Sequence, residues 1–394
     1  MFTFQHIYKA YMACRKTKRN TSSQLLFERD LLTNLWDLQR DLSTFRYNIG
    51  ASLCFLTSSP KLREIFAADF RDRVVHHVLV QQLEPLFERK FIHDVYNNRK
   101  GRGTHEAVKQ AKRYMNQTHG GYYLQLDIKG FFYALNKEIL FNKIKKEVLS
   151  SSDILQNALE SETSVTNKTR LKPSVPSVSL DVPSILYLTS KILFYDPTRN
   201  YVFKGDASKQ ALLPAHKTLF RIPKNRGLPI GNLSSQFFAN VYMSDFDNFV
   251  KRKLKVKRYL RYVDDFVLFD ESKERLEFLK QEIDRYLEKE LHLKLREDSK
   301  LKRHAEGLDF LGYVIRPNYT LVRQRVVKNF KKKKAKYLNQ YESKKGKMEL
   351  LEIKKFLSVK ASFVSHSKHA DSFNLLNKVG TLNENNPFDY ARTE

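Results

Sequence analysis

Residues 259–269 have the sequence YLRYVDDFVLF, in which two short apolar runs flank a pair of aspartates. Tyr, Val, Leu and Phe favour β-strands, and so brief a polar interruption between such runs predicts a hairpin with an acidic tip. The tip carries Asp264 and Asp265. An Asp-Asp pair in a turn is usually just solvated, so the hairpin alone does not identify a function.

A third aspartate ends a second predicted strand. Residues 121–128 have the sequence GYYLQLDI, preceded by a glycine turn, and Asp127 stands at the end of the apolar run. Carboxylates that converge at strand ends repel one another unless a cation lies between them. Mg²⁺ accepts carboxylates together with substrate phosphates, and two such ions support in-line phosphoryl transfer. Asp127, Asp264 and Asp265 are therefore candidate catalytic residues with two Mg²⁺ ions as cofactor.

The charge of the chain indicates the substrate class. The 394 residues carry a formal net charge of +28, which favours a polyanionic partner such as a nucleic acid. The two cysteines, Cys14 and Cys54, exclude a disulfide framework or a zinc ribbon. No long apolar run predicts a membrane span, and charged residues interrupt any signal-peptide core. We therefore expect a cytoplasmic protein with no membrane partner.

The remaining pattern predicts a mixed α+β chain. Leucines at three- and four-residue spacing predict a core-facing helix over 21–45. A stretch rich in Ser, Thr, Pro and Val at 150–184 predicts a loop or disordered insertion. The last 70 residues are Lys-rich and mostly helical in pattern. Further helices are predicted at 70–95, 104–115, 136–149, 233–257 and 272–290. Short strands are predicted near 292–296 and 308–315.

Four segments resemble motifs of reverse transcriptases and occur in that family's order. They are LDIKGFF at 126–132, GLPIGNLSSQFFANVYMSDFD at 227–247, YVDD at 262–265 and LDFLGYVI at 308–315. The resemblance implies an RNA-directed DNA polymerase of the right-hand fold, with an antiparallel palm sheet, helices and a helical thumb. It divides the chain into an N-terminal region with fingers (1–120), a palm with fingers segments (121–317, including the 150–184 insertion loop) and a basic thumb (318–394).

The loop that supports the nucleotide narrows the resemblance. Group II intron and retroviral enzymes carry a Gln-Gly…Ser-Pro signature, where this chain has Ile230-Gly231 and Ser235-Gln236. That form is similar to bacterial reverse transcriptases of diversity-generating retroelements. Three further segments share this likeness: 61–77, 101–108 and 196–206. Defence-associated and unknown-group reverse transcriptases are close relatives of these enzymes. One sequence does not distinguish the three groups.

For the reaction centre, the resemblance implies that Asp127 and Asp264 are metal ligands, with Asp265 beside them. Ile128 offers its carbonyl to the second metal. Phe132 matches the steric gate that excludes a ribose 2′-OH. Because adjacent side chains point to opposite faces, one of Phe131 and Phe132 is expected in the core.

For the nucleotide, the resemblance implies contacts from both sides. Arg63 matches the arginine that clamps the triphosphate as a planar donor fork, with Lys61 as a second candidate. Ile230 cannot make the hydrogen bond that a Gln makes, so either fidelity is reduced or the side chain simply packs. The other expected nucleotide contacts are Gly231, Ser235, Gln236 and Lys300, the last matching a lysine that protonates pyrophosphate.

Basic residues elsewhere are candidates for nucleic-acid contacts. Arg71 and Arg73 either contact the template or pair with Asp69 and Asp72. Arg99, Lys100 and Arg102 precede a predicted helix start, which suits phosphate contact, although a solvated loop is an equal alternative. A thumb helix that follows phosphates is predicted from Lys328, Lys331, Lys332, Lys333 and Lys334, interleaved with Phe330 and Tyr337.

The family also implies partners and competing roles. An RNA template, a DNA or RNA primer and deoxynucleoside triphosphates are expected, with a small basic helical accessory protein or a second polymerase subunit. The enzyme is bacterial or phage-encoded on this view. The alternatives are an antiviral defence enzyme that copies a noncoding RNA, a catalytically silent RNA-binding protein, and a ribonucleotide polymerase. Intact aspartates argue against the silent protein, and Phe132 argues against the ribonucleotide polymerase.

Overall fold

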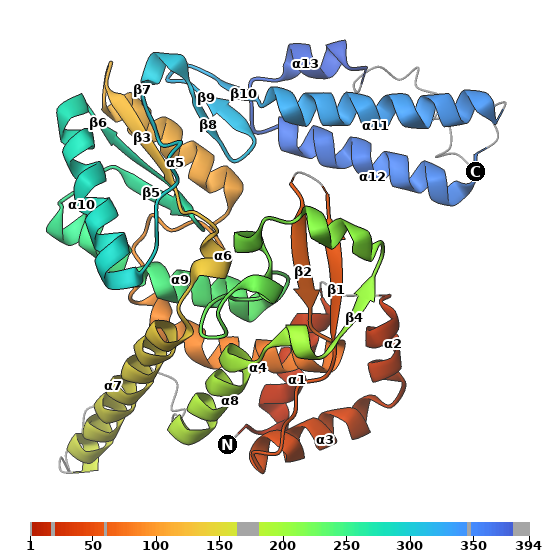
Figure 1. Cartoon of the computed structure of the whole chain (residues 1–394), viewed down its shortest axis with the longest axis vertical. Helices are drawn as coiled ribbons and strands as arrows, with labels where there is room; N and C mark the ends of the chain where they lie inside the picture. Colours follow the sequence, from red (N-terminus) through yellow and green to blue (C-terminus); the bar gives the residue numbers. More distant parts are fainter. Residues whose placement is uncertain (1, 17–19, 59–60, 164–180, 345–347, 381–394) are drawn as a thin grey trace. The chain divides into compact units, whose positions relative to one another are not determined.

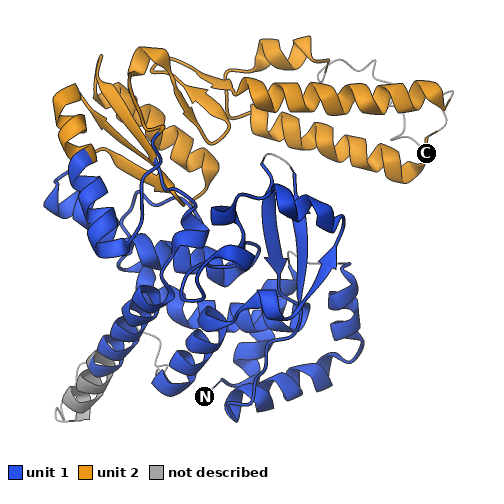
Figure 2. Ribbon diagram, in the orientation of Figure 1, with its two compact units in different colours: residues 1–98, 127–256, 281–297 blue, residues 99–126, 257–280, 298–394 orange. Residues whose placement is uncertain are grey.

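Distant parts of the sequence meet in this protein, so neither of its two compact units is one continuous segment (Figure 2). The computed structural model describes residues 2–16, 20–58, 61–163, 181–344 and 348–380 (Figure 1). Unit 1 comprises 1–98, 127–256 and 281–297, and unit 2 comprises 99–126, 257–280 and 298–394. Residues 99–120 thus belong to the same unit as the hairpin and the C-terminal helices.

Unit 1 is built around helix α4, against which α1 and α9 both pack. A three-stranded sheet of order β2-β1-β4 accompanies these helices, with β1 antiparallel to β2 and parallel to β4. The helices are α1 (Phe4–Arg15), α2 (Ser22–Arg29), α3 (Leu31–Ser43), α4 (Phe70–Glu88), α6 (Phe131–Ala134), α7 (Lys137–Thr163), α8 (Val182–Phe194) and α9 (Leu233–Asn248). The strands are β1 (Ser52–Thr57), β2 (Arg63–Ala67) and β4 (Tyr201–Lys204). The short 3-10 helices are η1 (Pro197–Arg199), η2 (Ala207–Leu212), η3 (Ala215–Lys217) and η4 (Leu219–Arg221), and η5 (Phe249–Lys253) is a π-helix.

Unit 2 holds two antiparallel sheets and the C-terminal helices. The order of the larger sheet is β5-β6-β3-β7, and that of the smaller is β10-β9-β8. The strands are β3 (Tyr122–Asp127), β5 (Tyr259–Tyr262), β6 (Asp265–Asp270), β7 (Lys300–Arg303), β8 (Leu308–Phe310), β9 (Tyr313–Ile315) and β10 (Thr320–Val322). The helices are α5 (Thr104–Gln117), α10 (Lys273–Leu291, whose end lies in unit 1), η6 (His304–Glu306), α11 (Gln324–Ser343), α12 (Leu350–Ser367) and α13 (Phe373–Lys378).

The expected helix over 21–45 is wrong in two respects. Asp30 has φ −122° and ψ 50°, which breaks the segment into α2 and α3. The break turns the leucines onto different faces, so Leu35 is buried while Leu26 and Trp36 are 62% and 57% exposed. Trp36 stacks instead on Phe4, with ring centroids 4.5 Å apart. Apolar spacing therefore identified helix but did not identify which side chains face the core.

The expected insertion loop at 150–184 is wrong in its first part, because α7 continues to Thr163. Its serines and few large apolar residues suggested a loop, but a helix that extends a packed one adds a backbone hydrogen bond per residue at little cost. Residues 164–180 of that prediction lie outside the described residues, and α8 begins at Val182.

The C-terminal helices share their own apolar core. Phe330 of α11 stacks on Phe363 of α12 with centroids 4.0 Å apart and an interplanar angle of 4°. Val322, Leu376 and Val379 complete the buried cluster. The α+β class and the helical, Lys-rich C-terminal region are thus as expected. Among the described helices, none is both long enough and apolar enough to span a membrane.

Candidate active site

The β5–β6 hairpin presents the first two aspartates. Tyr262 pairs with Asp265, so Val263 and Asp264 alone form the turn. Val263 has φ +62°, a conformation that a two-residue hairpin turn requires but that suits glycine rather than a β-branched residue. Arg261 is fully buried and donates from Nη1 to the Val263 carbonyl at 2.8 Å. This buried guanidinium therefore braces the strained turn that carries Asp264.

Asp265 is held by a glutamine of the neighbouring strand. Gln125 of β3 donates from Nε2 to Oδ1 and Oδ2 of Asp265 at 3.1 and 3.3 Å. The same nitrogen lies 3.2 Å from the Asp309 carbonyl of β8. Asp264 stands at the turn, whereas Asp265 belongs to the β6 ladder and is engaged with the sheet. The two adjacent aspartates therefore have different backbone settings, one in the turn and one in the strand.

Asp127 is the last residue of β3, and its carboxylate faces a basic segment. Arg296 lies 3.1 Å from Asp127 Oδ2 through Nη1, and the Arg296 backbone N–H donates to the Asp127 carbonyl at 2.9 Å. Ile128 bridges Leu295 in the same antiparallel run. The strand expected near 292–296 is thus wrong: the segment forms only this isolated bridge. The side chain of Ile128 is buried, while its carbonyl remains the expected ligand.

The number of protein ligands that gather at one point bears on how Mg²⁺ could bind. Among the described residues, no three or more His, Cys, Asp or Glu side chains gather to hold a metal ion. The aspartates therefore do not form a closed protein cage in this conformation. Mg²⁺ is commonly held by one or two carboxylates, waters and substrate phosphates rather than by such a cage. Fewer than three clustered side-chain ligands are therefore compatible with the expected use of Mg²⁺.

Replacing Arg296 with Gln is expected to lower the Mg²⁺ concentration that half-saturates DNA synthesis. The arginine competes with a cation for Asp127, and both side chains are about one-third exposed. An exposed pair of this kind contributes ~1 kcal/mol or less, so the shift should be about two- to fivefold. Mn²⁺ binding followed by electron paramagnetic resonance gives a second readout. Arg285→Gln, an exposed arginine of α10, is the control, and an unchanged or weaker Mn²⁺ affinity in Arg296→Gln would refute competition.

The loop expected to support the nucleotide is fastened to strand β2. The Ile230 carbonyl accepts from the Phe66 N–H at 2.9 Å. Gly231 has φ +129°, and a Cβ there would lie 2.9 Å from Ile65 and 3.1 Å from the Phe66 carbonyl, so only glycine fits. Asn232 accepts from the Ala68 N–H at 3.0 Å. Beyond it, Ser235 is buried while Gln236 is exposed.

The two adjacent phenylalanines point to different environments, as expected. Phe131 is 2% exposed and belongs to the core, whereas Phe132 is only half-buried. The Phe132 carbonyl accepts from the Leu228 N–H at 2.7 Å, which ties α6 to the loop before Ile230. Phe132, not Phe131, is therefore the residue available to a ligand.

The remaining expected nucleotide contacts are exposed basic side chains. Arg63 opens strand β2 and Lys61 precedes it, and both are exposed. Next to Arg63, Glu64 is 1% exposed and accepts from Thr218 Oγ1 at 2.7 Å and from the Leu219 N–H at 2.9 Å. Lys300 opens β7 directly opposite Gln125, the residue that holds Asp265.

A buried histidine anchors the start of α9. Nδ1 of His76 lies 2.7 Å from Ser234 Oγ, and His76 is 6% exposed. Burial, with help from His77 and Arg73, lowers the pKa of His76 from 6.5 to about 3. The folded protein therefore keeps this histidine neutral where the unfolded chain takes up a proton.

This shift predicts loss of stability in acid. Between pH 6.5 and about 3 the unfolded chain binds the His76 proton and the folded chain does not. The free energy of unfolding then falls by up to about 1.4 kcal/mol per pH unit from this residue. Buried Glu64 and Asp72, whose pKa values are raised by desolvation, act in the opposite direction. The measurement is therefore the slope of the free energy of unfolding against pH between pH 6.5 and 4.5. This slope should be smaller in His76→Gln than in wild type or in the control His119→Gln, which replaces an exposed histidine. Equal slopes in the three proteins would contradict the predicted role of His76.

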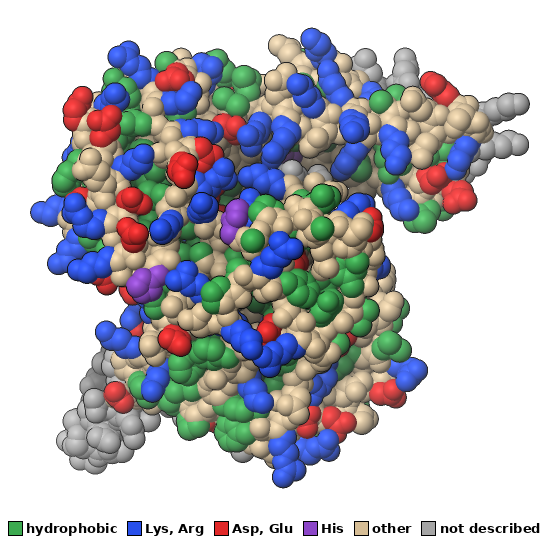
Figure 3. Space-filling view, viewed as in Figure 1, with side chains coloured by type: hydrophobic (Ala, Val, Ile, Leu, Met, Phe, Trp, Pro, Cys, Tyr) green, Lys and Arg blue, Asp and Glu red, His purple; other side chains and the backbone are tan. Residues whose placement is uncertain are grey.

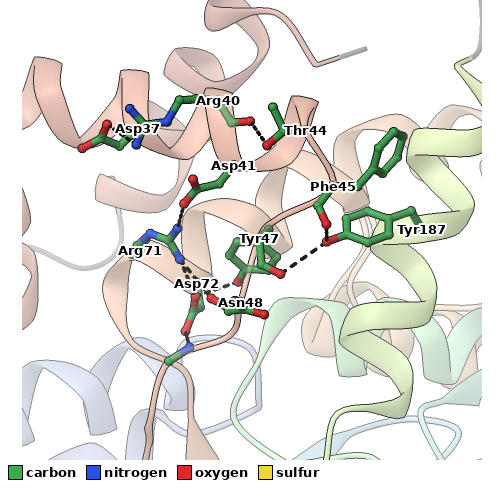
Figure 4. Close-up of polar contacts among 11 residues, drawn as sticks. Asp37, Arg40, Asp41, Thr44, Phe45, Tyr47, Asn48, Arg71, Asp72 and Tyr187 are labelled. Carbon is green, nitrogen blue, oxygen red and sulfur yellow. Dashed lines mark hydrogen bonds and ion pairs between the residues drawn. The ribbon is translucent and has the colours of Figure 1, made fainter.

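Arg71 and Arg73 are engaged within unit 1. Arg71 lies 2.6 Å from Asp41 and 3.7 Å from Asp72, and its Nη1 donates to the Asn48 carbonyl (Figure 4). Buried Asp72 also accepts from Tyr47 Oη at 2.6 Å. Arg73 Nε donates to the Ala68 carbonyl at 2.7 Å. The pairing alternative for Arg71 is therefore the one seen, with Asp41 as a partner that the sequence did not suggest.

The other basic candidates divide by exposure. Arg99 and Arg102 are half-buried before α5, and the Arg102 N–H donates to the Arg99 carbonyl at 3.1 Å. On α11, Lys328, Lys331, Lys332 and Lys333 are exposed. Figure 3 shows many Lys and Arg side chains on one face of the molecule. Lys334 instead donates to the Val379 carbonyl at 2.8 Å. Of the two aromatic residues expected among these lysines, Phe330 is buried in the core and Tyr337 packs on Phe356, with ring centroids 5.2 Å apart.

Sequence reasoning missed several residues that shape the site. Gln125 and Arg296 contact Asp265 and Asp127, and Arg261 contacts the Val263 carbonyl in the hairpin turn. Asn232 and Glu64 fasten the nucleotide loop and the neighbouring turn. Gln125 had a usable signal, because it lies two residues before Asp127 and so on the same face of one strand. The contacts of Arg296, Asn232 and Glu64 join segments far apart in sequence and had none, whereas Arg261 lies two residues before Val263 on the same hairpin.

Comparison with known proteins identifies part of the chain. Residues 193–315 match the family model described as reverse transcriptase (RNA-dependent DNA polymerase). Protein YkfC of Escherichia coli (strain K12) is 21% identical over 316 residues, covering 71% of this chain and 70% of YkfC. The group II intron-encoded protein LtrA of Lactococcus lactis subsp. cremoris is 24% identical over 320 residues, covering 75% of this chain. The chain spans about half of LtrA, 49% of its length.

Solved telomerase structures are also similar. Telomerase from Candida albicans, in complex with the TWJ fragment of telomeric RNA, is 12% identical, covering 91% of this chain and 62% of that chain at a TM-score of 0.43. Apo telomerase from Candida tropicalis is 14% identical, covering 68% of this chain and 47% of that chain at a TM-score of 0.44. The matched segment contains Asp264 and Asp265, whereas Asp127 precedes it. Residues 193–315 therefore match the reverse transcriptase domain of RNA-dependent DNA polymerases, and the helices and mainly antiparallel sheets of the chain confirm the expected α+β class.

Proposed function

We propose that this protein copies an RNA template into DNA by two-metal nucleotidyl transfer. The observation that carries the proposal is the tight β5–β6 turn that presents Asp264 inside the reverse transcriptase domain. Asp127 supports it, because β3 ends at that residue and is the neighbour of β6 in the sheet. The net charge of +28 favours a nucleic-acid primer and template.

In the proposed reaction the primer 3′-oxygen bonds to the α-phosphorus of a deoxynucleoside triphosphate. The bond from that phosphorus to the bridging oxygen breaks, and pyrophosphate leaves. Divalent cations supply activation of the 3′-hydroxyl and stabilisation of the leaving group when bound. Asp127, Asp264 and the Ile128 carbonyl would hold them. Asp265, engaged by Gln125, is assigned to positioning, and exposed Arg63 and Lys61 are assigned to the triphosphate.

Phe132→Ala is expected to weaken discrimination against ribonucleotides. A bulky ring beside the sugar clashes with a 2′-hydroxyl, and alanine leaves that space open. We expect the preference for deoxynucleotides, measured as the ratio of kcat/KM values, to fall by at least about tenfold, or ~1.4 kcal/mol. Phe131→Ala is the matched control, since it removes a core ring and should reduce stability without changing that ratio. Equal ratios in wild type and Phe132→Ala would refute the gate.

For the biological role we infer a diversity-generating retroelement enzyme. Ile230 supports this role, because it presents an apolar side chain where a glutamine would offer a hydrogen bond, and a site without a polar contact discriminates less. The second candidate is an antiphage defence reverse transcriptase that copies a dedicated noncoding RNA with partner proteins. The loop sequence from Gly231 to Ser235-Gln236, which is similar to that of diversity-generating enzymes, favours the first role.

The test is to sequence the nucleic acid that copurifies with the protein expressed from its native locus, before and after Mg²⁺ and deoxynucleotides are added. Complementary DNA of a template repeat with changes at adenines would support the diversity-generating role. Faithful or repetitive copies of an unrelated noncoding RNA would support defence. Wild-type protein that yields no more DNA than Asp264→Ala would overturn the polymerase proposal.

A further inference from the structure

A basic pocket in unit 1 lies beside the turn that follows Asp127. It has a volume of about 450 Å³, and its floor includes Gly130 and Tyr133 around helix α6. Its charged or titratable lining residues are Lys129, His216, Arg226, Glu288, His292 and Lys294. Three permanent cations thus face one carboxylate. None of these residues belongs to the expected catalytic or nucleotide-binding set.

Backbone hydrogen bonds hold the walls of this pocket in place. The Lys129 N–H donates to the Lys294 carbonyl at 2.9 Å, next to the bridge between Ile128 and Leu295. On the other wall, the Lys137 N–H donates to the Asn225 carbonyl at 2.9 Å, and Asn136 bridges Arg226. The cations therefore project from fixed backbone, which lowers the ordering cost of binding an anion.

Gly130 brings a third segment close. It has φ +58°, and a Cβ there would lie 3.1 Å from the His216 carbonyl. Burial, then Lys217 and Lys129, lowers the pKa of His216. At neutral pH this imidazole therefore adds a hydrogen-bond donor, not a fourth positive charge. The pocket combines a planar guanidinium, two ammonium groups and a neutral donor.

This chemistry suits a small polyphosphate. Arginine binds phosphate through two parallel N–H groups, and lysines add point charges. The one opposing carboxylate, Glu288, lies 3.9 Å from Lys294 with both side chains mostly exposed, so the ion pair is weak and easily displaced. A volume of about 450 Å³ also lies in the range of ordinary ligand pockets.

We propose that this pocket is an accessory polyphosphate site that takes inorganic pyrophosphate or the phosphate chain of a free nucleotide. The assignment of a role rests on the proposed polymerase function, because pyrophosphate is the product of that reaction. Lys129 is two residues beyond Asp127. Lys294 is two residues before Arg296, which forms an ion pair with Asp127. An anion in the pocket thus acts on the backbone run that holds Asp127 and slows synthesis when pyrophosphate accumulates.

The binding test uses full-length, metal-free protein titrated with inorganic pyrophosphate by calorimetry. We expect the dissociation constant to rise at least tenfold in the Arg226→Gln/Lys294→Gln double variant. Lys289→Gln, an exposed lysine on the same end of α10 that does not line the pocket, should leave it unchanged. Arg63→Gln should also leave it unchanged, which separates this pocket from the expected triphosphate clamp. No binding, or equal binding by wild type and the double variant, would overturn the proposal.

Two further arms distinguish the sources of the polyphosphate and the two proposals. Deoxyadenosine triphosphate that binds to the pocket variants as tightly as to wild type, while pyrophosphate does not, would identify the pocket as specific for the product. Asp264→Ala should retain pyrophosphate binding although it makes no DNA. If wild type makes no DNA but still binds pyrophosphate through Arg226 and Lys294, the polymerase proposal fails and the pocket stands.

Discussion

Asp264→Asn is expected to reduce DNA synthesis by on the order of a thousandfold, because it removes the negative charge at the tip of the hairpin. Asparagine preserves the volume and the planar shape of the side chain. It is uncharged, so it cannot neutralise the charge of a divalent cation. Asp264 lies in the turn, outside the backbone ladder that pairs β5 with β6. The melting temperature and the affinity for a primer–template should therefore change little.

The matched control is Asp270→Asn, at the other end of strand β6. Asp270 has a 19% exposed side chain, lies 3.5 Å from Arg275 and accepts from the Ser272 N–H. Its replacement should cost stability and leave the chemical step intact. Two outcomes would contradict the role of Asp264: synthesis by the Asn variant at a wild-type rate, or loss of activity only in proportion to unfolded protein.

Arg261→Met is expected to cost about 2–4 kcal/mol of folding stability and at least tenfold in kcat. Methionine fills much of the same space but leaves the Val263 carbonyl without the donor that lies 2.8 Å away. Val263 is held at φ +62°, a conformation that costs a β-branched residue about 1–2 kcal/mol. Without the buried guanidinium the turn should relax toward ordinary backbone and move the Asp264 carboxylate.

A double-mutant cycle distinguishes bracing from simple packing. Val263→Gly removes the steric cost of the positive φ, so Arg261→Met should cost less stability and less kcat in that background. The expected coupling is about 1 kcal/mol or more. The KM for primer–template should not move, because Arg261 is fully buried. Arg285→Met, an exposed arginine, is the control; additive effects of the two substitutions would refute the bracing role.

Local pattern was enough for the elements that carry the aspartates. Alternating β-formers on both sides of Asp264 and Asp265 predicted the hairpin, and the apolar run before Asp127 predicted β3, because strand formation there depends on nearby residues. Phe131 and Phe132 also divided between core and surface as neighbouring residues must. The same local reasoning failed where packing decides, as in the exposed Leu26 and Trp36 and in α7, which continues to Thr163.

The identities of the acidic residues, their order along the chain and the charge of +28 were readable from the sequence. Together with the four motifs that resemble those of reverse transcriptases, they led us to expect a nucleic-acid polymerase. The partners of those residues were not readable. Arg296 meets Asp127 across 169 positions, Gln125 meets Asp265 across 140, and Asn232 meets Ala68 across 164. Periodicity reports only which face of one element is apolar, whereas such long-range contacts depend on how whole elements pack. The tertiary structure therefore decided which arginines contact the hairpin turn and Asp127, and which lysines line the pocket beside Gly130.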